Sequence, residues 1–320
     1  MVTFQPRLTG IFTPSPEAID ELTARKYNRD FKGRAPRLPQ EVHAGEAEKL
    51  VQLQKEANFS LISDGQYSWG DLLRPVYAGM QGVEIGSQTR WFEVNGFVFP
   101  PKVVGKPKEA ERSIMPNYVS PSIMGSNGEV TLVGPYTIFR MLENEAKVPS
   151  AMIKYAFINQ FRQVASGLSP NVMLFEFCEP ALSYDIKHQL PGSEIREVLG
   201  FAKEVYQVSA LAVPRTARTL LQLPDGDFNE LWEYVRDLHV DGFGVDLTET
   251  VSPSPTISLE GKILSAGVLN ASSSVPENLA FSARRVRAAI ESWHPDTVYV
   301  TTNAQLFHTI SYEPAVAKVK

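Results

Sequence analysis

The chain has 320 residues and a net charge of −5, with 43% hydrophobic and 21% charged residues, which is ordinary for a soluble globular protein. Its one cysteine, Cys178, excludes an internal disulfide. We find no run rich in lysine and arginine, no apolar stretch long enough to span a bilayer and no signal-peptide pattern. We therefore expect a cytoplasmic protein that binds neither nucleic acid nor membrane.

Short apolar runs predict eight strands, over residues 7–12, 60–63, 130–133, 172–177, 219–223, 242–246, 263–266 and 297–301. Amphipathic stretches predict helices over residues 16–28, 40–57, 150–168, 193–208, 227–238 and 278–293. The alternation of strand and helix predicts an α/β fold with a parallel sheet. Eight strands predict closure into a single (β/α)8 TIM barrel over residues 1–320.

Residues 70–121 interrupt this alternation, because the segment is too long for a simple strand-to-helix loop. Within it, residues 88–94 and 97–99 flank Asn95-Gly96, the dipeptide most typical of a tight hairpin turn. We predict a β-hairpin inserted at the barrel rim after strand two. It could be a simple edge decoration, or it could serve as a lid or a partner-docking arm.

Several short motifs follow the predicted strands in order. They are residues 133–137 (Val-Gly-Pro-Tyr-Thr), 179–182 (Glu-Pro-Ala-Leu) and 265–270 (Ser-Ala-Gly-Val-Leu-Asn). They resemble motifs of cobalamin-independent methionine synthase, a family whose full-length members carry two related barrels. Residues 65–71 (Gly-Gln-Tyr-Ser-Trp-Gly-Asp) and 302–308 (Thr-Asn-Ala-Gln-Leu-Phe-His) resemble segments of the first, non-catalytic barrel.

The resemblance also implies that the zinc site of the catalytic barrel is absent here. The positions of its four ligands fall on Gln222, Pro224, Asp246 and Ala304. Proline and alanine offer no donor side chain, and zinc in such sites is held by thiolate, imidazole and carboxylate ligands. Only Asp246 could still coordinate, so we expect no metal and no other cofactor.

The residues that form the homocysteine pocket in the family are also replaced in this sequence. The serine and two carboxylates of that pocket fall on Ile11, Gln66 and Cys178, although an ammonium group needs carboxylates when it is desolvated. Cys178 itself is expected to be inert, because burial beside Glu179 would raise the pKa of its thiol.

A rim of polar side chains remains at the C-terminal ends of the strands, where barrel sites lie. We predict a ligand-binding role, with no catalytic residue assigned, for Gln66, Trp69, Asp71, Glu179, Asp246, Asn270, Asn303 and His308. Trp69 could stack on a planar ring such as a pterin, or it could pack under the hairpin. His308 could be a base or a structural histidine, and acids such as Asp227 could cap helices.

The resemblance implies a relative of the first methionine-synthase barrel that acts with a separate, zinc-bearing catalytic barrel in methyl transfer to homocysteine. Such a barrel could contribute interface surface and part of a site for a folate-like methyl donor. Two alternatives stay open: an independent methyl- or alkyl-transferase with a different substrate, and a purely structural subunit.

Overall fold

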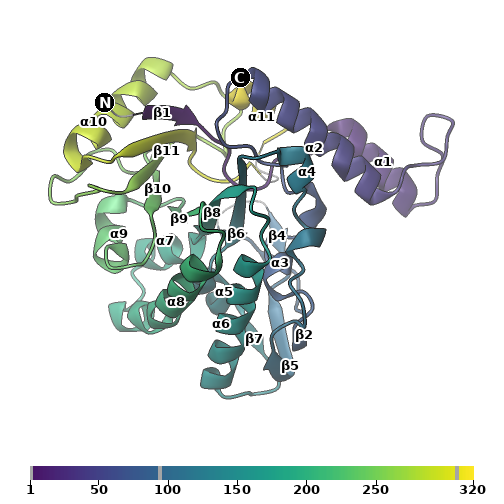
Figure 1. Cartoon of the computed structure of the whole chain (residues 1–320), viewed down its shortest axis with the longest axis horizontal. Coiled ribbons are helices and arrows are strands. Elements are labelled where there is room, and N and C mark those ends of the chain that lie inside the picture. The colour runs from purple at the N-terminus through teal and green to yellow at the C-terminus, as the bar shows by residue number, and fades with distance from the viewer. Residues whose placement is uncertain (1–2, 93–95, 307–309) are drawn as a thin grey trace.

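The computed structural model describes residues 3–92, 96–306 and 310–320. A curled sheet of seven parallel strands forms its centre, in the order β1-β12-β11-β10-β9-β8-β6 (Figure 1). These strands are β1 (Thr3–Pro6), β6 (Gly128–Val133), β8 (Val172–Cys178), β9 (Arg218–Leu223), β10 (Gly242–Asp246), β11 (Ile263–Leu269) and β12 (Thr297–Thr302). The architecture is an α/β fold consistent with a TIM-like barrel.

Six of the eight predicted strands correspond to strands of the sheet, and the first two do not. Residues 7–12 lie after β1, because the chain leaves the sheet once Arg7 has bonded to Val300 and turns at Gly10, whose φ is +68°. Residues 60–63 form only an isolated bridge between Ile62 and Gly128. The eighth strand position, between β6 and β1, is therefore a seam held by one bridged residue in the part of the chain that is described.

The six predicted helices are present, with ends that differ by a few residues. They are α1 (Pro16–Lys26), α2 (Pro39–Glu56), α6 (Ser150–Ser166), α8 (Gly192–Ala212), α9 (Phe228–Val235) and α10 (Leu279–Trp293). Ser15, Asp227 and Asn278 cap α1, α9 and α10 through side-chain oxygens. Shorter helices are α3 (Arg74–Tyr77), α4 (Pro121–Met124), α5 (Pro135–Met141), α7 (Pro180–Lys187) and α11 (Tyr312–Val319), with single turns η1 (Tyr67–Trp69) and η2 (Met115–Asn117).

The segment between η1 and β6 contains more structure than the sequence indicates. A small sheet joins β2 (Gln81–Ile85), β5 (Pro101–Lys108) and β7 (Glu143–Asn144). A second pair, β3 (Thr89–Arg90) and β4 (Phe97–Val98), is antiparallel and matches Thr89 with Val98. Residues 93–95, which include the predicted turn residue Asn95, lie outside the described residues.

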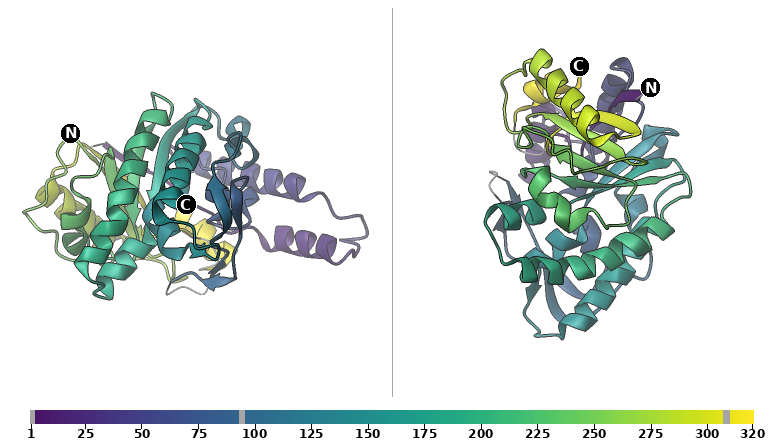
Figure 2. Two further views of the ribbon diagram at one scale, coloured as in Figure 1. Left: turned by 90° about the horizontal axis from the view of Figure 1, so that it is seen from below. Right: turned by 90° about the vertical axis from the view of Figure 1, so that its left-hand side faces the viewer.

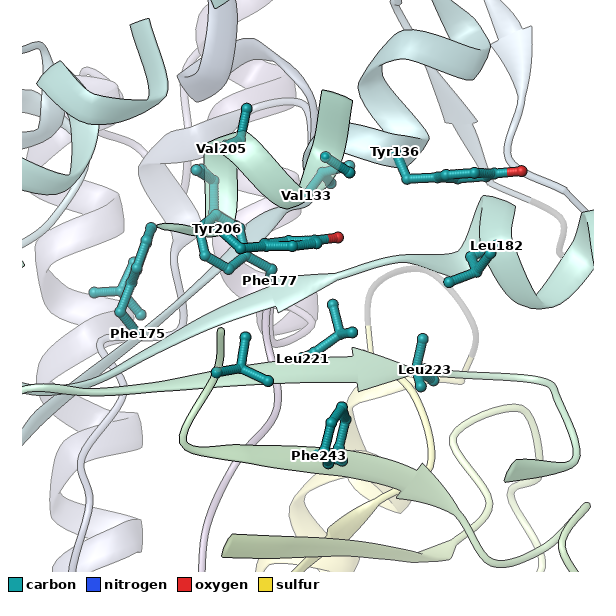
Figure 3. Packing of buried hydrophobic residues seen from close by; sticks show 14 of the residues in the cluster. Val133, Tyr136, Phe175, Phe177, Leu182, Val205, Tyr206, Leu221, Leu223 and Phe243 are labelled. Carbon is teal, nitrogen blue, oxygen red and sulfur yellow. The ribbon is translucent and has the colours of Figure 1, made fainter. Parts of the chain in front are cut away.

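A layer of aromatic residues fills the space between the sheet and its outer helices. Phe175 and Phe177 of β8 pack edge to face, and Tyr206 of α8 packs against Phe177 (Figure 3). Together with Leu221, Leu223 and Phe243 they form one continuous core, which fixes β8 to β10 and α8 as a rigid base for the strand ends. None of the described helices combines the length and the apolar character needed to cross a membrane.

Candidate functional site

Three charged side chains meet within the curled sheet. Arg7 donates from Nε to Glu129 Oε2 at 2.9 Å and from its two terminal nitrogens to both oxygens of Glu176, at 2.6 and 3.0 Å. All three side chains are buried. Burial lowers the pKa of Arg7, but the two carboxylates more than offset this effect, so its pKa is raised; burial raises the pKa of Glu129.

None of these three residues is among the site residues predicted from the sequence. A signal for Glu176 was present, because Phe175-Glu176-Phe177 alternates apolar and charged residues, and side chains of a strand alternate between its two faces. Thr131 and Ser265 also bond to the cluster, at 2.8 and 3.0 Å. These bonds link the residue that follows β1 to β6, β8 and β11. The cluster lies below the strand ends, and its role there is structural.

Glu179 is a buried helix cap. Its carboxylate accepts from the backbone N–H groups of Tyr136 and Thr137 at 2.9 and 2.7 Å, from the Thr137 hydroxyl at 2.7 Å and from the Tyr206 hydroxyl at 2.5 Å. These contacts satisfy the N-terminus of α5 from the end of β8. Burial raises the pKa of Glu179 to about 7, although the hydrogen bonds from Tyr206 and Thr137 act in the opposite direction.

This pKa makes Glu179 a source of pH-dependent stability. Because the folded-state pKa lies above the usual 4.5, the contribution of Glu179 is fully present below that value and is lost as the pH rises through about 7. We expect Glu179→Gln to remove this dependence. The difference in unfolding free energy between wild type and variant, measured by urea denaturation, should fall by about 2–3 kcal/mol from pH 4.5 to pH 8.5.

Other buried acids do not confuse this comparison, because wild type and variant share them and their effects cancel in the difference. Asp185→Asn shows what the removal of another buried carboxylate does to stability; Asp185 accepts from the Tyr136 hydroxyl at 2.7 Å and also pairs with Arg140 at 2.6 Å. If the difference between wild type and Glu179→Gln stays constant across this pH range, Glu179 does not titrate there.

The ends of β10 and β12 share a second polar network. Asn303 donates to Asp246 Oδ2 at 3.0 Å, and the other oxygen of Asp246 accepts from the Thr248 hydroxyl at 2.6 Å. Gln222 of β9 donates to the Asn303 carbonyl at 3.0 Å, and Asp225 donates its backbone N–H to Asp246. Asp246 and Asn303 are thus brought together as predicted site residues, but they are buried and already bonded to protein groups.

A small cavity lies at the centre of the strand ends. Its lining includes Cys178, Pro224 and Ala304 from three strand ends, Trp91 next to β3 and Phe97 of β4. Its volume is about 40 Å³. Small-molecule sites usually measure roughly 300–1,000 Å³, so this cavity holds little more than water.

Three of the predicted site residues lie in or beside η1 and bond to backbone groups of the protein. Gln66 exchanges two hydrogen bonds with the backbone of Thr131, at 2.8 and 2.9 Å. Asp71 accepts from the Leu73 and Phe99 backbone N–H groups, both at 2.7 Å. Trp69 is 1% exposed and donates to the Tyr118 carbonyl at 3.0 Å, so its ring packs in the core.

The remaining candidates are placed at the edge of the strand ends or beyond the described structure. Asn270 is half-buried and accepts from the Ser272 backbone N–H at 2.8 Å, while its own N–H donates to Glu277. His308 lies outside the described residues. Cys178 is buried, and burial and the nearby Glu176 raise the pKa of its thiol well above the usual range.

The four positions that correspond to zinc ligands converge around Asn303. Gln222 and Asp246 bond to Asn303, and Pro224 and Ala304 line the central cavity beside it. Across residues 3–92, 96–306 and 310–320, no three His, Cys, Asp or Glu side chains are grouped so that they could hold a metal ion.

Comparisons with known proteins point to one family. A family profile described as cobalamin-independent synthase, N-terminal domain, matches residues 75–291. A curated relative from Campylobacter jejuni subsp. doylei, named 5-methyltetrahydropteroyltriglutamate–homocysteine methyltransferase, is 22% identical over 200 residues, covering 61% of this chain and 25% of the relative. A protein of the same name from Streptococcus suis is 22% identical over 253 residues, covering 75% and 32%. The chain spans less than a third of each of these relatives.

Solved structures show the same fold. A B12-independent methionine synthase from a Shewanella species, in complex with selenomethionine, has a TM-score of 0.75 at 15% identity, covering 99% of this chain and 95% of that one. A putative vitamin-B12 independent methionine synthase from Listeria monocytogenes has a TM-score of 0.73 at 12% identity, covering 100% and 95%.

Proposed function

Because this chain belongs to the cobalamin-independent synthase N-terminal domain family, we propose that it acts as a companion barrel in methyl transfer. In this role it works in the cytoplasm beside a separate, zinc-bearing catalytic barrel that transfers a methyl group to homocysteine. The companion supplies interface surface and part of the binding surface for a folate-like methyl donor, and it holds no zinc itself.

The observation that carries this proposal is the filled centre of the strand ends. Pro224 and Ala304 converge there without a donor side chain, and the remaining cavity of about 40 Å³ is too small for homocysteine or a methyl donor. The buried carboxylates of Glu179 and Asp246 are occupied by protein hydrogen bonds. A barrel with this interior is suited to contact a partner rather than to perform the reaction.

We expect no methionine from the isolated chain when it is supplied with homocysteine and a methylated pteroyltriglutamate, and no stoichiometric zinc in the purified protein. An unactivated thiol, with a pKa of about 8.5, is mostly protonated at neutral pH. A zinc-bearing barrel of the same family should co-purify from the source cells, and adding the chain should raise its turnover. If that barrel is fully active alone and does not co-purify, the companion role is excluded.

The segment over residues 88–101 is the proposed contact surface for the catalytic barrel. Phe97 is 50% exposed, whereas Trp91 is half-buried and packs against Phe92, with ring centroids 5.0 Å apart. Exposed aromatic residues are frequent anchors of interfaces. We expect Phe97→Ala to weaken binding of the co-purified barrel about tenfold, with Trp91→Ala affecting both binding and local packing.

Leu211→Ala is the matched control, because Leu211 is 83% exposed on α8, away from this segment. Both single variants should keep the wild-type melting temperature, and only Phe97→Ala should change the dissociation constant measured by calorimetry. Equal binding by Phe97→Ala and wild type would exclude this surface.

One observation favours the second candidate, an independent methyl- or alkyl-transferase with a different substrate. In the described structure, Gln222 Oε1 is buried at the strand ends without a hydrogen-bond partner. An unpaired buried acceptor is costly, and a donor from a ligand or an ordered water would remove this cost. Methyl transfer by the isolated chain to another acceptor, lost in Gln222→Leu, would support this candidate over the companion role.

A further inference from the structure

The segment that carries β3 and β4 lies over the centre of the strand ends. Trp91 and Phe97 of this segment line one side of the central cavity, and Cys178, Pro224 and Ala304 line the other side from the strand ends. The cavity between these two layers has a volume of only about 40 Å³. We call residues 88–92 and 96–97 the hairpin lid.

The base of the hairpin lid is fixed. One end follows β2 and the other leads into β5, and the Gly86 N–H donates to the Pro100 carbonyl at 2.8 Å. The Phe99 N–H donates to Asp71, and the Phe99 carbonyl accepts from the Tyr77 hydroxyl, both at 2.7 Å. Figure 2 shows the blue strands β2 and β5 beside α6, which supports this base. The two ends of the lid are therefore held next to each other, as in a hinge.

The backbone pairing within the hairpin lid is short. The strands β3 and β4 contain two residues each and, within the described part of the chain, pair only with each other. An isolated two-stranded pair is only marginally stable in water. In addition, Phe92 has a φ of +43°, a left-handed conformation that is unfavourable for a bulky side chain. Opening of the lid would release this strain.

Aromatic contacts hold the hairpin lid against the strand ends. Phe92 packs on Trp91 and on Tyr184 of α7, with ring centroids 5.0 and 5.4 Å apart. Trp91 is half-buried, whereas Phe97 is 50% exposed although it lines the central cavity. Apolar contacts are non-directional, so the lid can leave and return as a unit while the core beneath it stays folded.

We propose that the hairpin lid opens and closes about this base in the native protein, and that it thereby controls access to the centre of the strand ends. In the closed state the cavity holds little more than water. In the open state Pro224 and Ala304 form part of an apolar floor at the position where barrel sites lie. The opening is a property of the chain alone, so it does not depend on the proposed function.

The one cysteine of the chain serves as a probe of the lid. Cys178 ends β8, is 2% exposed and lines the cavity opposite Trp91 and Phe97. Iodoacetamide can reach its thiol only when the lid has moved or the whole chain has unfolded. We expect alkylation of the native full chain at pH 8, followed by mass spectrometry, at a rate that changes little with urea below the unfolding transition. Exposure through global unfolding would instead rise steeply with urea.

Two single variants distinguish these routes. Trp91→Ala removes the largest apolar contact of the lid and should speed the alkylation of Cys178 at least about tenfold. Val286→Ala is the matched control, because Val286 is 6% exposed on α10 and lies outside the lid. This control lowers the stability of the whole fold, so it speeds alkylation only if Cys178 is reached through global unfolding. The alkylation rate of Val286→Ala should equal that of the wild type.

A shortened chain gives an independent measurement. Replacement of residues 88–97 by two glycines removes the lid and keeps its base, and circular dichroism should show a folded protein. Cys178 should then be alkylated at least about 100-fold faster than in the wild type. Three results would each overturn the lid: wild-type alkylation that follows the global unfolding curve in urea, equal acceleration by Trp91→Ala and Val286→Ala, or a folded shortened chain that reacts no faster than the wild type.

Discussion

Arg7→Met is expected to destabilise the protein by about 3–5 kcal/mol, the range found when one partner of a buried ion cluster is removed. Glu129 and Glu176 would then lie within the curled sheet without a counter-charge, and four hydrogen bonds from the guanidinium would be lost. Urea denaturation at pH 8 measures the loss. The loss should be smaller at pH 5, because the unpaired carboxyl groups can then take up protons.

Two further variants identify the unpaired charge as the cause. Arg7→Met/Glu129→Gln/Glu176→Gln should recover much of the stability, since it removes the carboxylates together with their partner. Lys32→Ala breaks the exposed ion pair with Glu17 and should change the stability little. A loss below about 1 kcal/mol for Arg7→Met would contradict the role assigned to this cluster. If Arg7→Met does not fold, the triple variant still provides the test.

Gly134→Ala is expected to cost about 3 kcal/mol, at the upper end for one added methyl group in a packed core. A Cβ atom at this position would lie 2.2 Å from Glu179 Oε1 and 2.3 Å from Glu179 Cδ. Glu179 cannot move aside without breaking the four hydrogen bonds that cap α5 and bind Tyr206. The lost cap therefore adds to the steric cost.

Gly200→Ala is the matched control. Gly200 lies within α8, and a Cβ atom there meets nothing within 4 Å. The same substitution should stabilise the protein there by about 1 kcal/mol, because alanine favours the helix. In addition, Gly134→Ala combined with Glu179→Ala should cost less than the two single losses together, since the clash needs both side chains. Strict additivity would show that Glu179 is not the obstacle.

The sequence predicts the parts of this fold that depend on neighbouring residues. Ser15, Asp227 and Asn278 stand directly before the helices that they cap, so those helices begin close to the predicted positions. The five apolar runs that correspond to β8, β9, β10, β11 and β12 were also predicted, because an apolar run is a property of neighbouring residues. The short motifs at the strand ends also carry the family assignment, which the profile match confirms.

Other parts depend on contacts between distant residues. Glu129 and Arg7 are 122 positions apart, so nothing near either residue indicates the ion pair. The strand β5 contains Pro101, Gly105 and Pro107, which argue against a strand in any local scale. Pairing with β2 and β7 overrides that preference. Trp69 and Asp71 were predicted as ligand contacts from their position alone, whereas their partners Tyr118 and Phe99 come from the inserted segment.

The seam at Ile62 gives the sheet two edges, β1 and β6, in place of a closed ring. An open edge presents unpaired backbone groups that can recruit strands from other chains and lead to aggregation. The edge at β1 is only four residues long and ends in Pro6, which lacks the N–H that a ladder requires. At β6, Ile62 accepts from the Glu129 N–H, and the adjacent backbone is thereby blocked. The two edges are thus protected in different ways. The β1 edge is short and ends in a proline, and the β6 edge is covered by the residue Ile62 of the same chain.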